Sequence, residues 1–321
     1  MSDGEVRYQV RPNLLRRANW HDYTSRCIYM ITLVKSPHVP ELAYIIHPSP
    51  DIYRSERTEA GLVASRFLES IFRFHEALKV WKYVVMPDHV HFELFVEREL
   101  PYPVGRFIGE FKASCTTAWR ERTGRGEPFF SPGFHDRIVS HQGQAAILRK
   151  YIADNPRRLW IKLHNPDLFM RRHRLSIAGQ EYEAIGNIFL LDDMDLQAVR
   201  ISRRFSPEEL HERKLCWLHT IENGGVLVSP FISAAEKRVR DYAFANDGRL
   251  ILIEQNGFSP RYKPTGQYFD LCAEGRLLMI APVEYSTARI ELTRDWCLRH
   301  NELAEQIAAR NCRLTGEVGF V

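Results

Sequence analysis

The chain has 321 residues, of which 45% are hydrophobic and 26% are charged, and its formal net charge at pH 7 is +4. These values are typical of a soluble globular protein, and the length is enough for two domains. The sequence has no run of 18 apolar residues and no apolar secretory segment, which argues against membrane insertion and export and predicts a cytoplasmic protein.

The charged residues are distributed unevenly along the chain, whereas the cysteines are scattered. Residues 1–175 carry 27 Lys and Arg against 19 Asp and Glu, whereas residues 176–321 carry 17 against 21. A basic first part suggests contact with a polyanion, but a solvated basic surface would give the same counts. The six cysteines include no C-x-x-C pair, which argues against a zinc ribbon and against a disulfide framework.

The hydrophobic pattern of the first half of the chain predicts alternating strands and helices. Strand patterns cover residues 28–34, 80–86, 89–96 and 129–139, and amphipathic helix patterns cover 58–78, 103–122 and 144–155. This order predicts an α+β fold, a ferredoxin-like βαββαβ antiparallel sheet with one appended helix. We expect that helix to stop at Pro156, because proline lacks the backbone N–H that continues a helix. The long connection 36–55 contains a candidate extra strand.

The remaining residues predict a second domain of a different kind. Strand patterns cover residues 184–191, 226–231, 249–254 and 277–282, and helix patterns cover 207–222, 234–245 and 286–310. Continuous apolar strands that alternate with helices favour a smaller α/β domain with a parallel sheet. We therefore divide the chain into domains 1–175 and 176–321, with the basic stretch 170–174 as the linker. The role of the second domain is unknown.

The segment MPDHVHFELFV carries the first chemical signal. Residues i and i+2 of a strand point to the same face, so His89 and His91 would direct two imidazoles at one point. Two neighbouring imidazoles are the beginning of a divalent metal site. An H-x-H taken alone is more often structural, so the interpretation depends on a further ligand.

The helix pattern 144–155 contains candidates for the missing groups. Tyr151 and Asn155 are four residues apart and therefore lie on one helical face. The amide oxygen of Asn155 is a hard ligand that suits Mg²⁺ or Mn²⁺, and the phenol of Tyr151 is a candidate nucleophile. Taken alone, Tyr151 could be a packing residue, and an Asn before a proline is a common helix end.

Three segments in this order, YVVMPDHVHFELFV, FFSPGFHDRIV and KYIADNPRR, resemble the single-tyrosine HUH transposases. These are the insertion-sequence-200-like family, and the resemblance is closest to the REP-associated tyrosine transposases. It covers residues 20–165, about half of the chain. It implies that His89, His91 and Asn155 are metal ligands and that Tyr151 is the catalytic nucleophile.

The same resemblance implies a substrate and a reaction. The protein would nick and rejoin single-stranded DNA beside a hairpin through a 5′-phosphotyrosine intermediate, with Mg²⁺ or Mn²⁺ as cofactor and in association with the nucleoid. Basic residues near the site are candidate DNA phosphate contacts: Lys112, Arg137, Lys150, Arg157 and Arg158. Relatives act as monomers or as dimers that exchange the tyrosine helix, so a homodimer stays open.

Two other classes of function compete with the strand transferase. A domesticated protein could bind hairpin DNA on the same scaffold without catalysis, although a pure binder need not keep all four site residues. A phosphohydrolase acting on a small nucleotide could use the H-x-H motif alone. That class needs a second His motif or a third alternating His, and the position two residues after His91 is Glu93.

Overall fold

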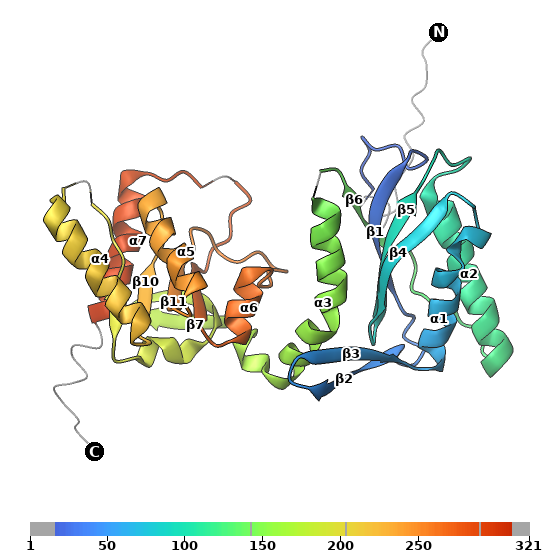
Figure 1. The fold of residues 1–321 in the computed structure, drawn as a ribbon, viewed down its shortest axis with the longest axis horizontal. Coiled ribbons are helices and arrows are strands. Elements are labelled where there is room, and N and C mark those ends of the chain that lie inside the picture. Colours follow the sequence, from blue (N-terminus) through green and yellow to red (C-terminus); the bar gives the residue numbers. More distant parts are fainter. Residues whose placement is uncertain (1–16, 142, 203, 289, 310–321) are drawn as a thin grey trace, which may run out of the picture. The chain divides into compact units, whose positions relative to one another are not determined.

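The computed structural model describes residues 17–309 except 142, 203 and 289. It divides the chain into two compact units, Met1–Trp160 and Ile161–Val321. The two units differ in the kind of sheet around which each is built (Figure 1).

The first unit is built on a four-stranded antiparallel sheet with the order β4-β5-β1-β6. Its strands are β1 (Cys27–Val34), β4 (Leu78–Val85), β5 (His89–Val96) and β6 (His135–Val139). The connecting helices are α1 (Glu59–Glu69), which is followed by a short 3-10 turn (Ile71–Arg73), and α2 (Val104–Thr123). The predicted ferredoxin-like βαββαβ arrangement is confirmed.

The two faces of this sheet are used differently. Alternating residues of β1 and β5, such as Tyr29, Ile31 and Phe92, are fully buried and form the core beneath α1 and α2. The other face carries Thr32, His91 and further polar side chains. Helix α3 (Gln144–His164) lies over this second face, on the side of the sheet away from α1 and α2 (Figure 1).

Helix α3 continues through Pro156, so the predicted stop at Asn155 is wrong. A proline inside a helix removes one backbone hydrogen bond and costs about 3 kcal/mol. An ion pair spans the proline, because Arg157 binds both carboxylate oxygens of Asp154 at 2.6 and 3.2 Å. Together with the burial of Pro156, this pair helps to keep the helix continuous.

Two further predictions for this unit need correction. The long first connection contains a hairpin of two strands, β2 (Ala43–Ser49) and β3 (Ile52–Arg57), where one extra strand was expected. The predicted strand 129–139 is ordered as a strand only from His135 onward. Pro132 and Gly133, the latter with a φ of 76°, interrupt it, and Phe129 and Phe130 before them fill the core as part of a loop.

The second unit contains a six-stranded sheet with the order β7-β8-β12-β11-β10-β9. Strands β9 (Leu196–Ala198), β10 (Val226–Ser229), β11 (Arg249–Ile253) and β12 (Leu277–Pro282) are parallel. Strands β8 (Gln180–Gly186) and β7 (Arg172–Ile177) extend the sheet in antiparallel fashion. The parallel α/β core is confirmed, but the stretch 170–174 enters β7 and is not a linker.

The helices of the second unit form two layers around this sheet. Residues of α4 (Pro207–Glu222), α5 (Ala234–Ala245) and α6 (Gln267–Ala273) share one apolar cluster. Residues of α7 (Arg294–Ala309) and of a 3-10 helix (Ile188–Asp192) pack into the cluster on the other face. No helix in the described part of the chain is long and apolar enough to cross a membrane.

Gly61 in α1 gives the first testable prediction. A Cβ added at Gly61 would stand 1.9 Å from the carbonyl oxygen of Leu42, which also accepts a hydrogen bond from Thr58. We therefore expect Gly61→Ala to lower the free energy of unfolding by about 3 kcal/mol, because backbone must move to admit the methyl group. Urea denaturation monitored by circular dichroism measures this change.

A second helical glycine provides the matched control. Gly109 in α2 is exposed, and a Cβ added there meets no atom within 4 Å. Gly109→Ala should be neutral or should raise stability by about 0.5–1 kcal/mol, since alanine is the better helix former. Equal effects of the two substitutions would contradict the packing of α1 against Leu42.

Candidate active site

Strand β5 places both histidines of the H-x-H motif on the sheet face that α3 covers. The strand begins after a tight turn, in which the backbone N–H of Met86 donates to the carbonyl of His89 at 2.8 Å. The ring centroids of His89 and His91 are 4.3 Å apart, with the rings nearly perpendicular. His91 is 8% exposed and the His89 side chain is 20% exposed. The predicted pairing of the two imidazoles is therefore present.

Each imidazole is oriented by a partner at Nδ1. The hydroxyl of Thr32, directly opposite on β1, lies 2.7 Å from His91 Nδ1, and an Asp88 carboxylate oxygen lies 2.6 Å from His89 Nδ1. Both contacts leave Nε2 as the free ring nitrogen. His89 Nε2 is buried and has no hydrogen-bond partner among the described residues. Such an orphaned nitrogen, on a ring held at its other nitrogen, fits a metal ligand.

The electrostatics of the pair agree with a ligand role. Burial, together with the neighbouring His89, lowers the pKa of His91 to about 3, so its imidazole is neutral at physiological pH. The hydrogen bond with His89 lowers the pKa of Asp88, which keeps that carboxylate ionised. A neutral ring with its proton on Nδ1 presents a lone pair on Nε2, the form that binds metal ions.

The depressed pKa of His91 makes the stability of the metal-free protein depend on pH. In the unfolded chain a histidine titrates near 6.5, so between pH 6.5 and about 3 the unfolded chain binds a proton that the folded protein does not. The contribution of His91 to the free energy of unfolding is therefore complete above pH 6.5, and it is lost as the pH falls toward 3. At pH 5 this loss should reach about 2 kcal/mol.

His91→Asn tests this prediction, because asparagine keeps a polar group beside Thr32 but does not titrate. The urea midpoint of each protein is measured at pH 7.5 and at pH 5 with chelator present. From pH 7.5 to pH 5 it should fall further for the wild type than for His91→Asn. Equal losses in the two proteins would contradict a buried, neutral His91.

Tyr151 lies beside the histidine pair on helix α3. The centroid of its ring is 5.8 Å from that of His91, and its side chain is 36% exposed. The Arg158 guanidinium carbon is 5.8 Å from the centroid of the same ring. The tyrosine ring is thus next to the imidazole of His91, and the residue is partly exposed to solvent.

Asn155 lies one turn further along α3 and is 8% exposed. Its side-chain nitrogen donates to the backbone carbonyl of Tyr151 at 2.7 Å, which leaves the side-chain oxygen for another partner. Within the part of the chain that the structure describes, no third His, Cys, Asp or Glu joins the histidines in a metal-binding group. The role of Asn155 as an oxygen ligand stays a prediction.

The candidate DNA contacts fall into two groups. Arg137 on β6 and Lys150 on α3 are exposed. The other three are held by the protein itself. Lys112 donates to the carbonyls of Ser131 and Gly133 at 2.6 and 2.9 Å, Arg157 pairs with Asp154, and Arg158 is 9% exposed. Arg137 and Lys150 are therefore better placed to reach a phosphate.

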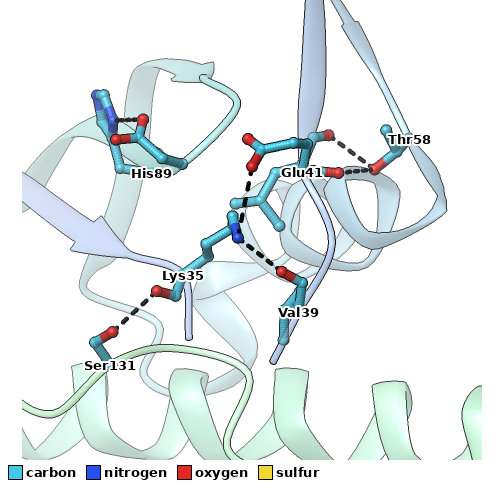
Figure 2. A network of polar contacts seen from close by, with 8 residues as sticks. Lys35, Val39, Glu41, Thr58, His89 and Ser131 are labelled. Carbon is cyan, nitrogen blue, oxygen red and sulfur yellow. Dashed lines mark hydrogen bonds and ion pairs between the residues drawn. The ribbon is translucent and has the colours of Figure 1, made fainter. Parts of the chain in front are cut away.

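The loop that follows β1 supports the turn before the histidines. The Lys35 ammonium donates to the Val39 carbonyl at 2.7 Å and lies 3.7 Å from a Glu41 carboxylate oxygen, and Figure 2 shows it directed at these two residues and not at His89. The Lys35 backbone N–H donates to the Asp88 carbonyl at 2.9 Å, and Ser131 donates to the Lys35 carbonyl. These hydrogen bonds hold the loop after β1 against the turn that precedes His89.

Sequence reasoning missed several residues of this site. Thr32 and Asp88 orient the two imidazoles, and Glu93 and Arg149 form an ion pair between β5 and α3. Asp88 and Glu93 could have been found, since Asp88 adjoins the motif and Glu93 continues the face of His89 and His91. Thr32 and Arg149 could not, because their partners are distant in the sequence.

Comparisons with known proteins add likenesses of structure. No family model matches the sequence, and no curated protein matches it. A REP-associated tyrosine transposase bound to a REP hairpin is similar at 15% identity and a TM-score of 0.34, over 44% of this chain and 74% of that one. A candidate transposase of Deinococcus radiodurans R1 is similar at 16% identity and a TM-score of 0.27, over 43% of this chain and 95% of that one. Structural similarity at this level does not show what this protein does.

Proposed function

We propose that this protein is a metal-dependent endonuclease and strand transferase of single-stranded DNA, a transposase-like enzyme with a tyrosine nucleophile. The observation that carries the proposal is the position of the exposed Tyr151 beside His91, the ring that pairs with His89, whose Nε2 is buried and orphaned. A tyrosine packed only for stability has no need of such neighbours.

The reaction that suits this arrangement is a transesterification. The Tyr151 oxygen attacks the phosphorus of a DNA phosphodiester and loses its proton, while the bond from phosphorus to the 3′ oxygen breaks and that oxygen takes up a proton. The product is a 5′-phosphotyrosine ester and a free 3′-hydroxyl. Attack of another 3′-hydroxyl on this ester reverses the step and joins two strands without an external energy source.

His89, His91 and Asn155 would hold the divalent ion, with their nitrogens and amide oxygen as ligands. A bound Mg²⁺ or Mn²⁺ would polarise the scissile phosphate and stabilise the charge that develops on its oxygens. The protein groups around it have separate tasks. Thr32 and Asp88 fix the imidazoles, and Arg158 keeps positive charge beside the tyrosine ring.

The proposed substrate is single-stranded DNA that carries a hairpin. The excess of Lys and Arg in residues 1–175, together with the exposed Arg137 and Lys150, suits a polyanion. The exposed position of Tyr151 suits a flexible single strand, which can bring its backbone to the phenol.

An adduct assay tests the proposal directly. The protein is incubated with Mg²⁺ or Mn²⁺ and a labelled pool of hairpin-bearing single-stranded oligonucleotides, and denaturing gels detect covalent protein–DNA bands. We expect a band that chelator abolishes, together with joined products when an acceptor 3′-hydroxyl is added. Tight hairpin binding with neither adduct nor cleavage would replace the proposal with a non-catalytic hairpin-binding protein.

A further inference from the structure

An ion pair between a buried glutamate and a solvent-exposed arginine joins the strand of the histidines to the helix of the tyrosine. Glu93 on β5 lies two residues after His91 and is fully buried. Arg149 on α3 lies two residues before Tyr151, and its guanidinium donates to both oxygens of Glu93 at 2.7 and 3.0 Å. The guanidinium carbon is also 4.9 Å from the centroid of the Trp81 ring. We call these three residues the latch.

The latch requires both a charged partner for Glu93 and a fixed geometry of the contact. A carboxylate without solvent exposure is costly unless it is paired and hydrogen-bonded, so Glu93 depends on Arg149. The guanidinium presents parallel N–H groups in a rigid plane, and this two-point contact fixes direction as well as distance. The stacked Trp81 ring, itself in contact with Phe95 at 4.4 Å between centroids, restricts the guanidinium further.

The positions of Arg149 and Tyr151 on α3 relate the ion pair to the rotation of the helix about its axis. Successive helical residues are about 100° apart, so Arg149 and Tyr151 lie on opposite flanks of the buried ridge formed by Leu148 and Ile152. Further buried residues follow toward the C-terminal end of the helix. A bidentate contact on one flank would oppose a rotation of the helix that turns the tyrosine, on the other flank, away from His91.

We propose that Glu93 and Arg149 are positioning residues, which hold α3 in the rotation that keeps Tyr151 beside the two histidines. The expected effect on catalysis rests on the proposed function. The packing of α3 on the sheet can be measured without any activity. Misplacement of a nucleophile by about 1 Å costs roughly 100-fold in rate, so loss of the latch should slow adduct formation by roughly 10- to 100-fold.

Four proteins test the inference: wild type, Arg149→Met, the double variant Glu93→Met/Arg149→Met, and Lys150→Met as the charge-matched control. Arg149→Met leaves Glu93 buried and unpaired, so its melting temperature should fall. The double variant removes both charges, so its stability should recover. Its adduct rate at saturating hairpin DNA should stay low, because an apolar pair does not fix the rotation of α3.

The outcomes separate positioning from stability. Lys150→Met removes the same charge from α3 and should weaken hairpin binding more than it slows the rate at saturation. Recovery of the adduct rate together with stability in the double variant would overturn the inference. Hydrogen exchange of residues 148–155 in DNA-free protein is the readout that needs no activity. Faster exchange in both latch variants is expected, and unchanged exchange would overturn the latch even if wild type forms no adduct.

Discussion

Tyr151→Phe is expected to abolish the covalent protein–DNA adduct and the joining of strands. Phenylalanine keeps the ring near His91 and removes only the oxygen that would attack phosphorus. Loss of a covalent nucleophile should lower the rate by at least about 10³-fold, below detection in a gel assay. Affinity for uncleaved hairpin DNA should change little, since the ring and the surrounding charges remain.

Tyr44→Phe is the control for this prediction. Tyr44 lies on β2 and is 64% exposed, so its hydroxyl can be removed without disturbing the core or the site. The variant should form adduct at the wild-type rate. An adduct that persists in Tyr151→Phe would assign the nucleophile to another residue and would contradict the proposed reaction.

His89→Gln is expected to cause the second large loss, in metal binding. His89 provides the orphaned Nε2, and a glutamine amide cannot place a comparable nitrogen lone pair there. Partners that only orient a ligand already contribute 10- to 100-fold to metal affinity, so loss of a ligand should weaken Mn²⁺ binding by at least about 100-fold. Titration calorimetry or Mn²⁺ electron paramagnetic resonance measures this affinity without DNA.

His38→Gln is the matched control, because His38 is exposed in the loop after β1 and lies outside the H-x-H motif in the sequence. Its Mn²⁺ affinity should equal that of wild type. Equal affinities in His89→Gln and wild type would remove the metal site from this face of the sheet, whatever the activity on DNA.

The sequence was most informative where local pattern and chemistry coincide. The alternation in β5 predicts that His89 and His91 share one face, and the four-residue spacing predicts that Tyr151 and Asn155 share one face of a helix. The order of strands and helices was enough for the ferredoxin-like sheet, because strands β1, β4 and β5 and helices α1 to α3 each overlap a segment of clear periodicity.

The errors arose where tertiary contacts override local signals. Pro156 indicates a helix end, but the pairing of Arg157 with Asp154 and the burial of the proline continue α3 to His164. Phe129 and Phe130 indicate a strand, but they are core residues of a loop. The side-chain partners of α3 on the sheet could not be predicted at all, since Arg149 and Glu93 are 56 residues apart in the sequence.

The most direct test of a tyrosine-linked strand transfer is mass spectrometry of the adduct after nuclease and trypsin digestion. Cleavage after Lys150 and Arg157 releases the peptide Tyr151–Arg157, in which Tyr151 is the only tyrosine. The proposed reaction predicts this peptide with one nucleotide esterified through its 5′-phosphate to the phenol of Tyr151. A nucleotide attached to any other residue, or cleaved DNA with no modified peptide, would contradict it.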